Sequence, residues 1–298
     1  MRILMSGASG LIGTALSRHL VADGHSVTRL VRRSPNAGEV SWDPAAGSID
    51  QGAFDGCDAV INLSGAGIGD KRWTDEYKEE LLSSRVQTTE LLATRMAALD
   101  HKPSVFLSGS AVGWYGDRGD ERLDELSTPG TDFLSGVCQR WEAATAAAEA
   151  AGIRTVHLRT GIVLAAQGGA LKKQLPLFKL GLGGRMGNGH QWQSWISIDD
   201  EVAAIAHLLS SDIFGAVNLT APNPVTNVEF TATLAKVLHR PAVLPVPMFG
   251  PKALLGGELV DALLLSGQRV SPTALQRSGY EFQHSTLEVA LRAILHRS

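Results

Sequence analysis

The sequence predicts an α/β protein in which a doubly wound parallel sheet is followed by a smaller, mainly helical C-terminal lobe. Two observations support this fold class. Short β-type runs alternate with helical stretches through the first half of the 298-residue chain, as they do where helices cover both faces of a parallel sheet. The alternation breaks at residues 181–189, where five of nine positions are glycine, and from Pro222 the chain is rich in helical segments and proline.

Apolar spacing and stop signals define the elements of the first half. Leu11, Ala15 and Leu16 lie on one face of a predicted helix over 11–22, which Gly24 ends. Thr74 is followed by two acidic residues and predicts a helix start, with apolar spacing that continues from residue 81 to 96. The expected strands are 2–6, 27–31, 59–63, 105–107 and, as a fifth, 155–158 with 162–164, and an Ala-rich helix is expected over 133–151.

The second half gives shorter elements. We expect a loop at 181–189, an extended segment at 195–198, a short helix at 200–209 and a further strand at 216–219. Asp199 and Asp200 come at the start of that helix, and N-capping explains at least one of them. The sequence from Thr226 to Glu229 is a capping box that opens a C-terminal helix.

Length and composition limit the class of protein. A chain of 298 residues matches about two domains of ~150 residues, and 44% hydrophobic with 19% charged residues excludes a disordered chain. We expect a first domain over 1–165, to which 197–221 return, and a substrate lobe made of 166–196 and 222–298.

Charge and cysteine content exclude further classes. The 27 basic and 30 acidic residues give a net charge of −3 without a basic run, which argues against a nucleic-acid partner. Apolar stretches end well short of the ~18 residues that a membrane span needs. Cys57 and Cys138 lack metal-ligand spacing, which predicts free thiols, a reducing compartment and a cytoplasmic location.

Three glycines separate the first strand from the first helix. Gly7, Gly10 and Gly13 stand where a tight turn meets a helix N-terminus, and a bound pyrophosphate would need to approach the backbone there without meeting a Cβ atom. This placement predicts dinucleotide binding by a Rossmann-type domain, although glycine at such a turn also has a purely structural explanation.

The glycine spacing and several later motifs carry a family resemblance. The turn reads GxxGxxG rather than GxGxxG, and the other motifs are NLSG at 62–65, RW at 72–73, SR at 84–85, LSGSA at 107–111, WE at 141–142, RTGIV at 159–163, GNG at 187–189 and WISIDD at 195–200. With these motifs the chain resembles the extended short-chain dehydrogenase/reductases of the NAD(P)-dependent epimerase/dehydratase superfamily. It is most similar to an atypical subgroup, the NADP-dependent epimerase-family proteins, which carry an extra C-terminal helical region and include members associated with cell division.

The end of the second strand favours NADP(H) over NAD(H). Arg32 and Arg33 stand where an acidic residue would bind the ribose 2′-hydroxyl, and guanidinium groups suit a 2′-phosphate, although two solvated arginines are the alternative. The resemblance implies that Arg32 is the direct ligand and Arg33 a secondary one. It also implies cofactor contacts from Gly7, Ser9, Gly10, Leu11, Ile12, Gly13, Leu63, Ser64, Gly65, Arg85 and Ser108.

The resemblance fails at the catalytic pair. Related enzymes use a Tyr-x-x-x-Lys pair, in which lysine lowers the tyrosine pKa for proton exchange with the substrate. The residues four positions after the three tyrosines here are leucine, glycine and histidine, and the resemblance puts Leu134 and Cys138 at the positions of the pair. Ser110 matches the family Ser/Thr, with a core or loop serine as the alternative, and Tyr115 is a candidate substitute acid that could instead pack in the core.

Other candidates carry weaker signals. His190, Gln191, Trp192 and Trp195 follow the glycine-rich loop in a region that lines the substrate cleft of related proteins. Cys138 is expected to be an inert buried thiol, and neither a metal-ligand pattern nor Gly-x-Ser-x-Gly occurs in the sequence.

Two function classes follow from these observations. The first is an NADP(H)-dependent oxidoreductase or epimerase acting on an unknown small carbonyl or hydroxyl substrate, with a UDP-sugar epimerase as a weaker variant because those enzymes use the absent pair. The second is a non-catalytic NADP(H)-binding sensor or partner protein, which the resemblance links to cell division. A small molecule is the expected partner, and a homodimer is a possible assembly.

Overall fold

A mostly parallel sheet forms the centre of the molecule, as the sequence predicts. The computed structural model describes residues 1–296, apart from the side chain of residue 51. The sheet has eight strands in the order β12-β8-β6-β5-β1-β2-β3-β4, and all neighbours are parallel except the edge pair β3 and β4. The strands are β1 (Arg2–Ser6), β2 (Ser26–Val31), β3 (Glu39–Asp43), β4 (Ser48–Ile49), β5 (Ala59–Asn62), β6 (Val105–Ala111), β8 (Arg154–Thr160) and β12 (Gly215–Leu219).

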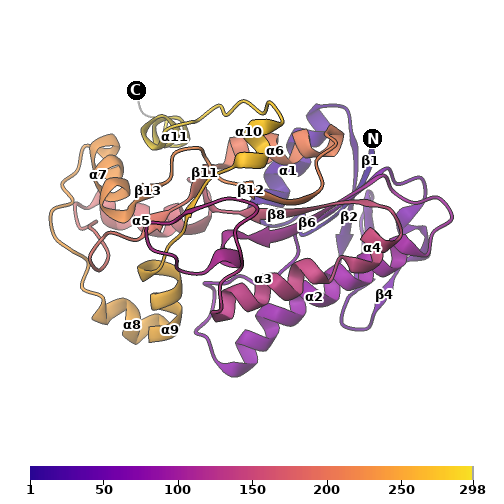
Figure 1. The fold of residues 1–298 in the computed structure, drawn as a ribbon, viewed down its shortest axis with the longest axis horizontal. Coiled ribbons are helices and arrows are strands. Elements are labelled where there is room, and N and C mark those ends of the chain that lie inside the picture. Colours follow the sequence, from indigo (N-terminus) through magenta and orange to yellow (C-terminus); the bar gives the residue numbers. More distant parts are fainter. Residues whose placement is uncertain (297–298) are drawn as a thin grey trace.

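Helices cover both faces of this sheet, as Figure 1 shows. One face packs against α1 (Leu11–Ala22) and α6 (Ile198–Ser210), and its apolar core includes Ile3, Leu16 and Ile205. The other face packs against α2 (Asp75–Ala97), α3 (Phe133–Ala143) and α4 (Ala146–Ala150), with Leu4 and Phe106 in its core. The arrangement is a three-layer α/β/α sandwich of the doubly wound type.

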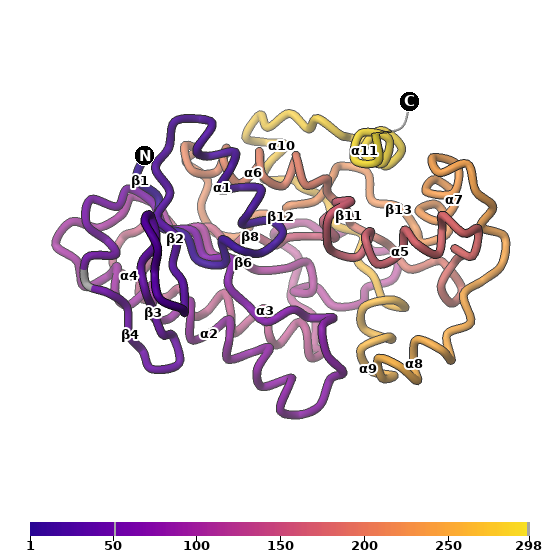
Figure 2. The backbone as a smooth tube through the Cα atoms, turned by 180° about the vertical axis from the view of Figure 1, so that it is seen from behind, coloured from indigo at the N-terminus to yellow at the C-terminus, as the bar shows by residue number. Residues whose placement is uncertain are grey.

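A second apolar core gathers elements from the later part of the chain. It joins α5 (Gly169–Lys179), α7 (Asn227–Leu238) and α11 (Leu287–Ile294) around Trp195, whose ring is fully buried. These helices lie together at the end of the molecule away from β4 (Figure 2). The remaining elements are β7 (Arg122–Leu123), β9 (Ile162–Leu164), β10 (Trp192–Gln193), β11 (Trp195–Ser197), β13 (Val225–Thr226), β14 (Arg269–Val270), α8 (Phe249–Leu255), α9 (Gly257–Val260), α10 (Thr273–Arg277), and the short turns η1 (Gln51–Phe54), η2 (Val112–Tyr115) and η3 (Asp261–Leu265).

Several predicted boundaries differ from the structure for local reasons. The Ala-rich segment is two helices rather than one, because the chain breaks at Thr145, whose hydroxyl oxygen lies 2.8 Å from the Glu142 carbonyl oxygen. The predicted fifth strand is also two strands, since β9 leaves the main sheet and pairs with β11. Strand β3 and the edge strand β4 were not predicted, while the capping box at Thr226 and Glu229 is confirmed.

Helix α6 begins earlier than predicted. Ser197 is its N-cap and accepts a hydrogen bond from the Asp200 backbone N–H, so the expectation that Asp199 or Asp200 serves as the cap is wrong. Asp200 is fully buried and its carboxylate accepts hydrogen bonds from the Gln283 and His284 backbone N–H groups at 2.7 and 3.0 Å. The carboxylate therefore ties the segment before α11 to the start of α6.

The strand register places a row of polar residues on the sheet face that α2 and α3 cover. Four residues stand side by side on neighbouring strands, namely Ser6, Asn62, Ser108 and His157. Two positions further along β6 and β8, Ser110 is beside Arg159. Because alternate residues of a strand share a face, this row and the Ser110–Arg159 pair form one polar band at the carboxyl end of the sheet.

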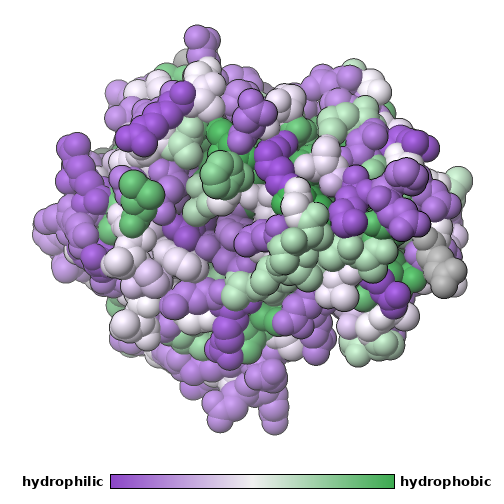
Figure 3. All heavy atoms as spheres, turned by 45° about the vertical axis from the view of Figure 1, so that its right-hand side comes forward, coloured by the Kyte–Doolittle hydropathy of each residue, from purple (hydrophilic) through white to green (hydrophobic). Residues whose placement is uncertain are grey.

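The molecular surface is mixed. On the face shown in Figure 3, apolar side chains are interspersed among hydrophilic ones. Among the described residues, no helix is both long and apolar enough to cross a membrane.

Replacing Asp200 should destabilise the protein far more than replacing its neighbour. Asp200→Ala removes the buried carboxylate that accepts from the Gln283 and His284 backbone N–H groups, and we expect the free energy of unfolding to fall by about 2–4 kcal/mol. Asp199→Ala, at the exposed neighbouring position, should change it by less than about 0.5 kcal/mol. Urea denaturation of both variants measures the difference, and equal stabilities would contradict the role of Asp200 as an anchor.

Candidate cofactor and active site

The glycine turn is shaped by backbone contacts at two of its three glycines. Gly7 has φ +69°, and a Cβ atom there would lie 2.4 Å from the Leu63 carbonyl oxygen. A Cβ atom on Gly13 would lie 2.2 Å from the Gly7 carbonyl oxygen, whereas one on Gly10 would meet only that oxygen, at 3.4 Å. Gly7 and Gly13 therefore allow the turn to pack on itself, and the outer side of Gly10 stays open.

The open side of the turn faces the start of α1. Gly10 is the N-cap residue, and no side chain of the described chain caps this helix. The first N–H groups of a helix have no partner within the helix, and together with the helix dipole they favour an anion. The glycine turn therefore has the geometry of a phosphate cradle, and the residues present fit a dinucleotide.

Two cavities adjoin this cradle. The smaller one has a volume of about 320 Å³ and lies between the turn, Leu63 and the chain around β9 and α5, where Ile162, Val163 and Ala170 line it. A larger cleft of about 850 Å³ runs between α1 and α6 and includes Ser9, Arg18 and Asp199. We assign the smaller cavity to the candidate site, because the glycines and Leu63 enclose it.

The two arginines after β2 differ in their surroundings. The Arg33 guanidinium forms a two-pronged ion pair with Glu39 on β3, at 2.7 and 2.8 Å. Arg33 and the Asn36 backbone N–H hold the pKa of the Glu39 carboxyl at about 2. Arg32 is exposed and forms no hydrogen bond or ion pair with any residue from 1 to 296. Of the two guanidinium groups, only that of Arg32 is unengaged.

A buried hydrogen-bond network supports the loop after β5. The Asn62 side-chain oxygen accepts from the Ser6 hydroxyl at 2.5 Å and from the Ser64 backbone N–H at 3.2 Å. Its amide nitrogen donates to the Thr89 hydroxyl on α2 at 2.8 Å, and Trp141 on α3 donates to the same hydroxyl at 3.1 Å. Asn62 therefore fixes the loop at Ser64 relative to β1, α2 and α3.

Arg85 also supports this loop. Its guanidinium donates to the Leu81 and Ala66 carbonyl oxygens at 2.8 and 3.0 Å and lies 5.0 Å from the centre of the Trp141 ring. Burial lowers its pKa from the usual arginine value. A Cβ atom on Gly65 would lie 3.0 Å from this guanidinium, so the loop passes directly over it. A contact between Arg85 and a cofactor stays a prediction.

Apolar and neutral groups occupy the positions that the resemblance assigns to the catalytic tyrosine and lysine. Leu134 packs with Trp73, Leu81 and Leu259 in a small apolar cluster. The Cys138 thiol lies 3.7 Å from the Ala111 carbonyl oxygen, and burial is the main cause that raises its pKa to about 12. Neither side chain is placed to exchange a proton near neutral pH.

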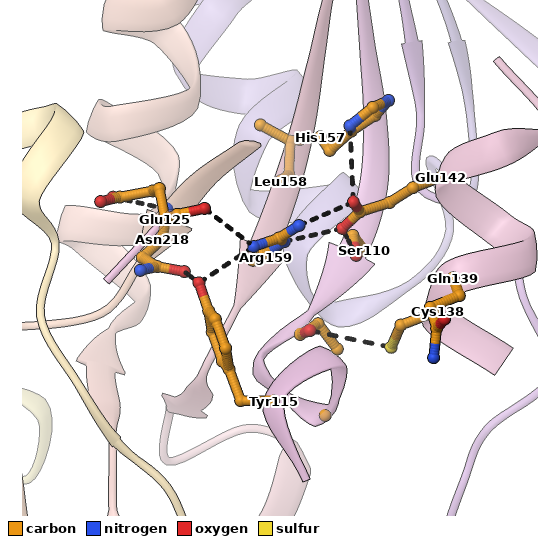
Figure 4. A network of polar contacts seen from close by, with 12 residues as sticks. Ser110, Tyr115, Glu125, Cys138, Gln139, Glu142, His157, Leu158, Arg159 and Asn218 are labelled. Atoms are coloured by element: carbon orange, nitrogen blue, oxygen red, sulfur yellow. Dashed lines mark hydrogen bonds and ion pairs between the residues drawn. The ribbon is translucent and has the colours of Figure 1, made fainter. Parts of the chain in front are cut away.

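One turn further along the same face of α3 is a carboxylate. Positions 134, 138 and 142 recur at the four-residue spacing of one helix face. Glu142 is 7% exposed and accepts a hydrogen bond from the Ser110 hydroxyl at 2.6 Å. Arg159 donates to both oxygens of this carboxylate, from Nε at 2.8 Å and from Nη2 at 2.9 Å (Figure 4).

Tyr115 belongs to the same network. Its hydroxyl donates to the Asn218 side-chain oxygen at 2.7 Å and accepts from Arg159 Nη1 at 3.1 Å. The ring is fully buried, and burial raises the pKa of Tyr115 to about 12. Tyr115 is therefore a neutral phenol engaged by two protein partners, and its role as an acid stays a prediction.

The other predicted residues do not meet at one point. Trp195 is in the core, and its Nε1 donates to the Asn223 carbonyl oxygen. Trp192 donates to Asp120 at 2.7 Å, while Gln191 donates to the Leu264 carbonyl oxygen at 2.7 Å and His190 is exposed. Ser108 is fully buried, and its hydroxyl has no partner among residues 1–296. That same range contains no group of three or more His, Cys, Asp and Glu side chains placed to hold a metal ion.

Sequence reasoning gave Glu142, His157 and Arg159 no functional role, although Glu142 and Arg159 belong to motifs that carry the family resemblance. Two signals were available: two charged or polar residues alternate within the buried strand RTVHLRT, and Glu142 stands four residues after Cys138. Because alternate residues of a strand share a face, His157 and Arg159 lie on the same face of the sheet. A buried arginine on that face needs an acidic partner.

The comparisons with known proteins agree with the motifs. Residues 3–219 match the model of the NAD dependent epimerase/dehydratase family, and residues 246–294 match a domain of unknown function, DUF1731. The chain is 45% identical to an epimerase family protein of Mycobacterium leprae over 97% of this chain and 94% of the relative. It is 38% identical to a human epimerase family protein over 99% of this chain and all of the relative.

Solved structures show the same relationship. The crystal structure of a human epimerase family protein with NADPH superposes with a TM-score of 0.89 at 35% identity and covers 99% of each chain. The UDP-glucose 4-epimerase of Thermus thermophilus, at 18% identity and a TM-score of 0.76 over 99% of this chain and 98% of that one, shares the fold. The chain therefore belongs to the NAD dependent epimerase/dehydratase family, as an epimerase-family protein of the extended short-chain dehydrogenase/reductase type.

Proposed function

We propose that this protein is an NADP(H)-dependent oxidoreductase that acts on a small carbonyl or hydroxyl compound, with Ser110 and Glu142 in place of the usual Tyr/Lys pair. The observation that carries the proposal is the 2.6 Å hydrogen bond from the Ser110 hydroxyl to Glu142, at the carboxyl end of the parallel strands, where the open glycine turn also lies. The human relative that was crystallised with NADPH supports the choice of cofactor.

Cofactor binding rests on three groups of this chain. The N–H groups at the start of α1 receive the pyrophosphate, and the open side of Gly10 allows its close approach. Arg32 binds the 2′-phosphate, because Arg33 is already paired with Glu39. Leu63, Ile162 and Val163 provide an apolar wall beside the turn. When bound, NADP(H) supplies or accepts the hydride.

Ser110 and Glu142 accept the proton of the substrate hydroxyl. The Ser110 hydroxyl donates its proton to Glu142, so its oxygen lone pairs remain free to accept a hydrogen bond from a substrate hydroxyl. Arg159 fixes the Glu142 carboxylate by two hydrogen bonds and thereby orients Ser110. Leu134 and its apolar neighbours stand where the resemblance places the phenol, so the substrate oxygen would find its hydrogen-bond partner at Ser110.

The C-terminal lobe closes the substrate side. Lys173 on α5 donates to the Gly69 carbonyl oxygen at 3.1 Å, and Lys78 on α2 pairs with Glu258 on α9 at 2.5 Å. Leu259 packs in the same apolar cluster as Leu134. We infer that residues 166–196 and 222–298 form the substrate lobe and that a small, largely apolar substrate binds between it and the first domain.

Arg32 should decide the cofactor preference. We expect NADPH to bind at least about 10-fold more tightly than NADH, a difference of about 1.4 kcal/mol, and Arg32→Ala to remove most of it. The matched control is the double variant Arg33→Gln, Glu39→Gln, which removes an ion pair without changing the net charge and should keep the preference. Calorimetry with both cofactors measures this. A preference that survives Arg32→Ala and disappears in the double variant would contradict the assignment.

A side chain at Gly10 should block the cofactor without unfolding the protein. The Cβ of Gly10→Val approaches only the Gly7 carbonyl oxygen, yet it occupies the side on which the pyrophosphate binds. We expect NADPH affinity to fall at least about 100-fold, and circular dichroism to show an unchanged fold. Gly250→Ala, where a Cβ meets nothing within 4 Å, is the control. A folded Gly10→Val variant with wild-type affinity would refute the phosphate cradle.

Turnover should be slow and should depend on Ser110. Without a positioned Tyr/Lys pair, we expect rates about 10²–10⁴-fold below those of related enzymes that have it. NADPH oxidation over a panel of small aldehydes and ketones measures this rate, and Ser110→Ala should abolish what remains. Tyr115→Phe is the comparison variant. Loss of turnover in Tyr115→Phe with Ser110→Ala unaffected would make Tyr115 the acid instead.

A further inference from the structure

We propose that His157 and Glu149 form a proton outlet that connects Ser110 and Glu142 to solvent on the α4 side of the sheet. This inference rests on the proposed function and adds the path by which the reaction exchanges its proton. The path leaves the candidate site on the side away from the glycine turn, so proton release does not require the substrate side to open.

The side chains form a continuous series from buried to exposed. Ser110 donates to Glu142 Oε1 at 2.6 Å, and Glu142 Oε2 lies 3.6 Å from His157 Nδ1. His157 Nε2 lies 3.2 Å from Glu149 Oε1. The exposed fraction rises from 4% at Ser110 and 7% at Glu142 to 13% for the His157 side chain and 49% for that of Glu149. The last group of the series is in contact with water.

Thr145 connects the outer part of the series. Its hydroxyl lies 3.0 Å from His157 Nε2 and donates to Glu149 Oε1 at 2.7 Å. The break between α3 and α4 falls at this residue, which brings Glu142 at the end of α3 and Glu149 on α4 to the same imidazole. The break that sequence reasoning missed therefore positions both carboxylates on His157.

The charges around His157 suit a relay. Glu142 on α3, Glu149 on α4 and Arg159 on β8 face the ring. Burial lowers the pKa of His157 from the usual histidine value, while the two carboxylates act in the opposite direction. At neutral pH the ring is therefore mostly neutral. With its proton on Nε2, where Glu149 accepts, Nδ1 presents a lone pair to Glu142.

The proton steps balance. When a bound alcohol loses hydride to the cofactor, its O–H proton passes to Ser110 Oγ as the Ser110 proton passes to Glu142. The protonated Glu142 carboxyl must turn so that the proton received on Oε1 faces the imidazole, and it then gives this proton to His157 Nδ1 while the Nε2 proton leaves to Glu149 and water. Proton exchange with water then returns the ring to the Nε2–H tautomer for the next turnover. One alcohol and one NADP⁺ thus give one carbonyl compound, one NADPH and one proton in solvent. The 3.6 Å between Glu142 and His157 is longer than a hydrogen bond, so the imidazole must approach Glu142 for this transfer.

The first test needs no turnover. Histidine-selective NMR in ligand-free protein follows the titration of His157, assigned by its loss in His157→Gln. Glu149→Gln removes a carboxylate that raises the pKa of His157, so we expect that pKa to fall by about 0.5. Glu90→Gln, at an exposed position of α2, should leave it unchanged. A His157 titration that is the same in wild type and Glu149→Gln would overturn the outlet.

The second test uses the pH profile of alcohol oxidation. Wild-type kcat should rise with pH through the His157 pKa and level off above it, because the neutral ring accepts the proton. His157→Gln should lower kcat at least about 10-fold and abolish the rise of kcat with pH, while NADPH affinity stays unchanged. Added imidazole should restore the rate. The control is His207→Gln on α6, on the opposite face of the sheet.

The outcomes separate the outlet from the proposed function. Wild-type turnover with an unchanged rate and pH profile in His157→Gln defeats the outlet alone. A loss that imidazole does not restore assigns His157 a merely structural role and also defeats it. Intact NADPH binding without turnover of any alcohol or carbonyl compound by the wild type defeats the proposed function, and the outlet with it.

Discussion

The buried ion pair between Glu142 and Arg159 is the constraint on which the candidate active site depends. Removing two charges from water is costly, and the pair is maintained because nearly every polar atom has a partner. Arg159 donates to both carboxylate oxygens and to the Tyr115 hydroxyl, and its guanidinium lies 3.9 Å from the centre of the Trp114 ring. The pair links β6, β8, α3 and η2, so a change in one partner leaves the other charge buried and disturbs all four elements.

Helix α3 presents a different set of side chains from the Tyr/Lys pair that the family resemblance leads us to expect. The family reaction uses a phenol made acidic by a neighbouring lysine, whereas here α3 presents a leucine, a neutral thiol and a carboxylate at successive turns. Only the carboxylate is charged, and Arg159 holds it in contact with Ser110. The glycine turn has the geometry of a phosphate cradle, and Arg32 is the cation that we propose for the 2′-phosphate. In the function that we propose, cofactor binding and proton transfer are therefore built from separate parts of the fold.

The parts of the structure that were predictable are those with local causes. The limits of β1 and α1, the capping box at Thr226 and the glycine turn follow from signals within a few residues. The network around Glu142 joins residues far apart in the chain, such as Tyr115 and Asn218, which are separated by 103 positions, and local patterns do not reveal such pairing. The break at Thr145 was hidden because alanines on both sides favour a continuous helix. Arg33 was predictable as a cation, but its pairing with Glu39 depends on β3, a five-residue strand that was not predicted although its sequence EVSWD alternates polar and apolar residues.

The most direct test of the account is a crystal structure of the protein with bound NADP⁺ and an alcohol. We expect the substrate hydroxyl to lie within hydrogen-bond distance of Ser110 Oγ, Ser110 still to donate to Glu142, and Leu134 to face the nicotinamide without a polar side chain beside it. A substrate oxygen bound instead by the Tyr115 hydroxyl, with Ser110 and Glu142 out of reach of it, would contradict the central claim that the Ser110–Glu142 pair replaces the missing tyrosine and lysine.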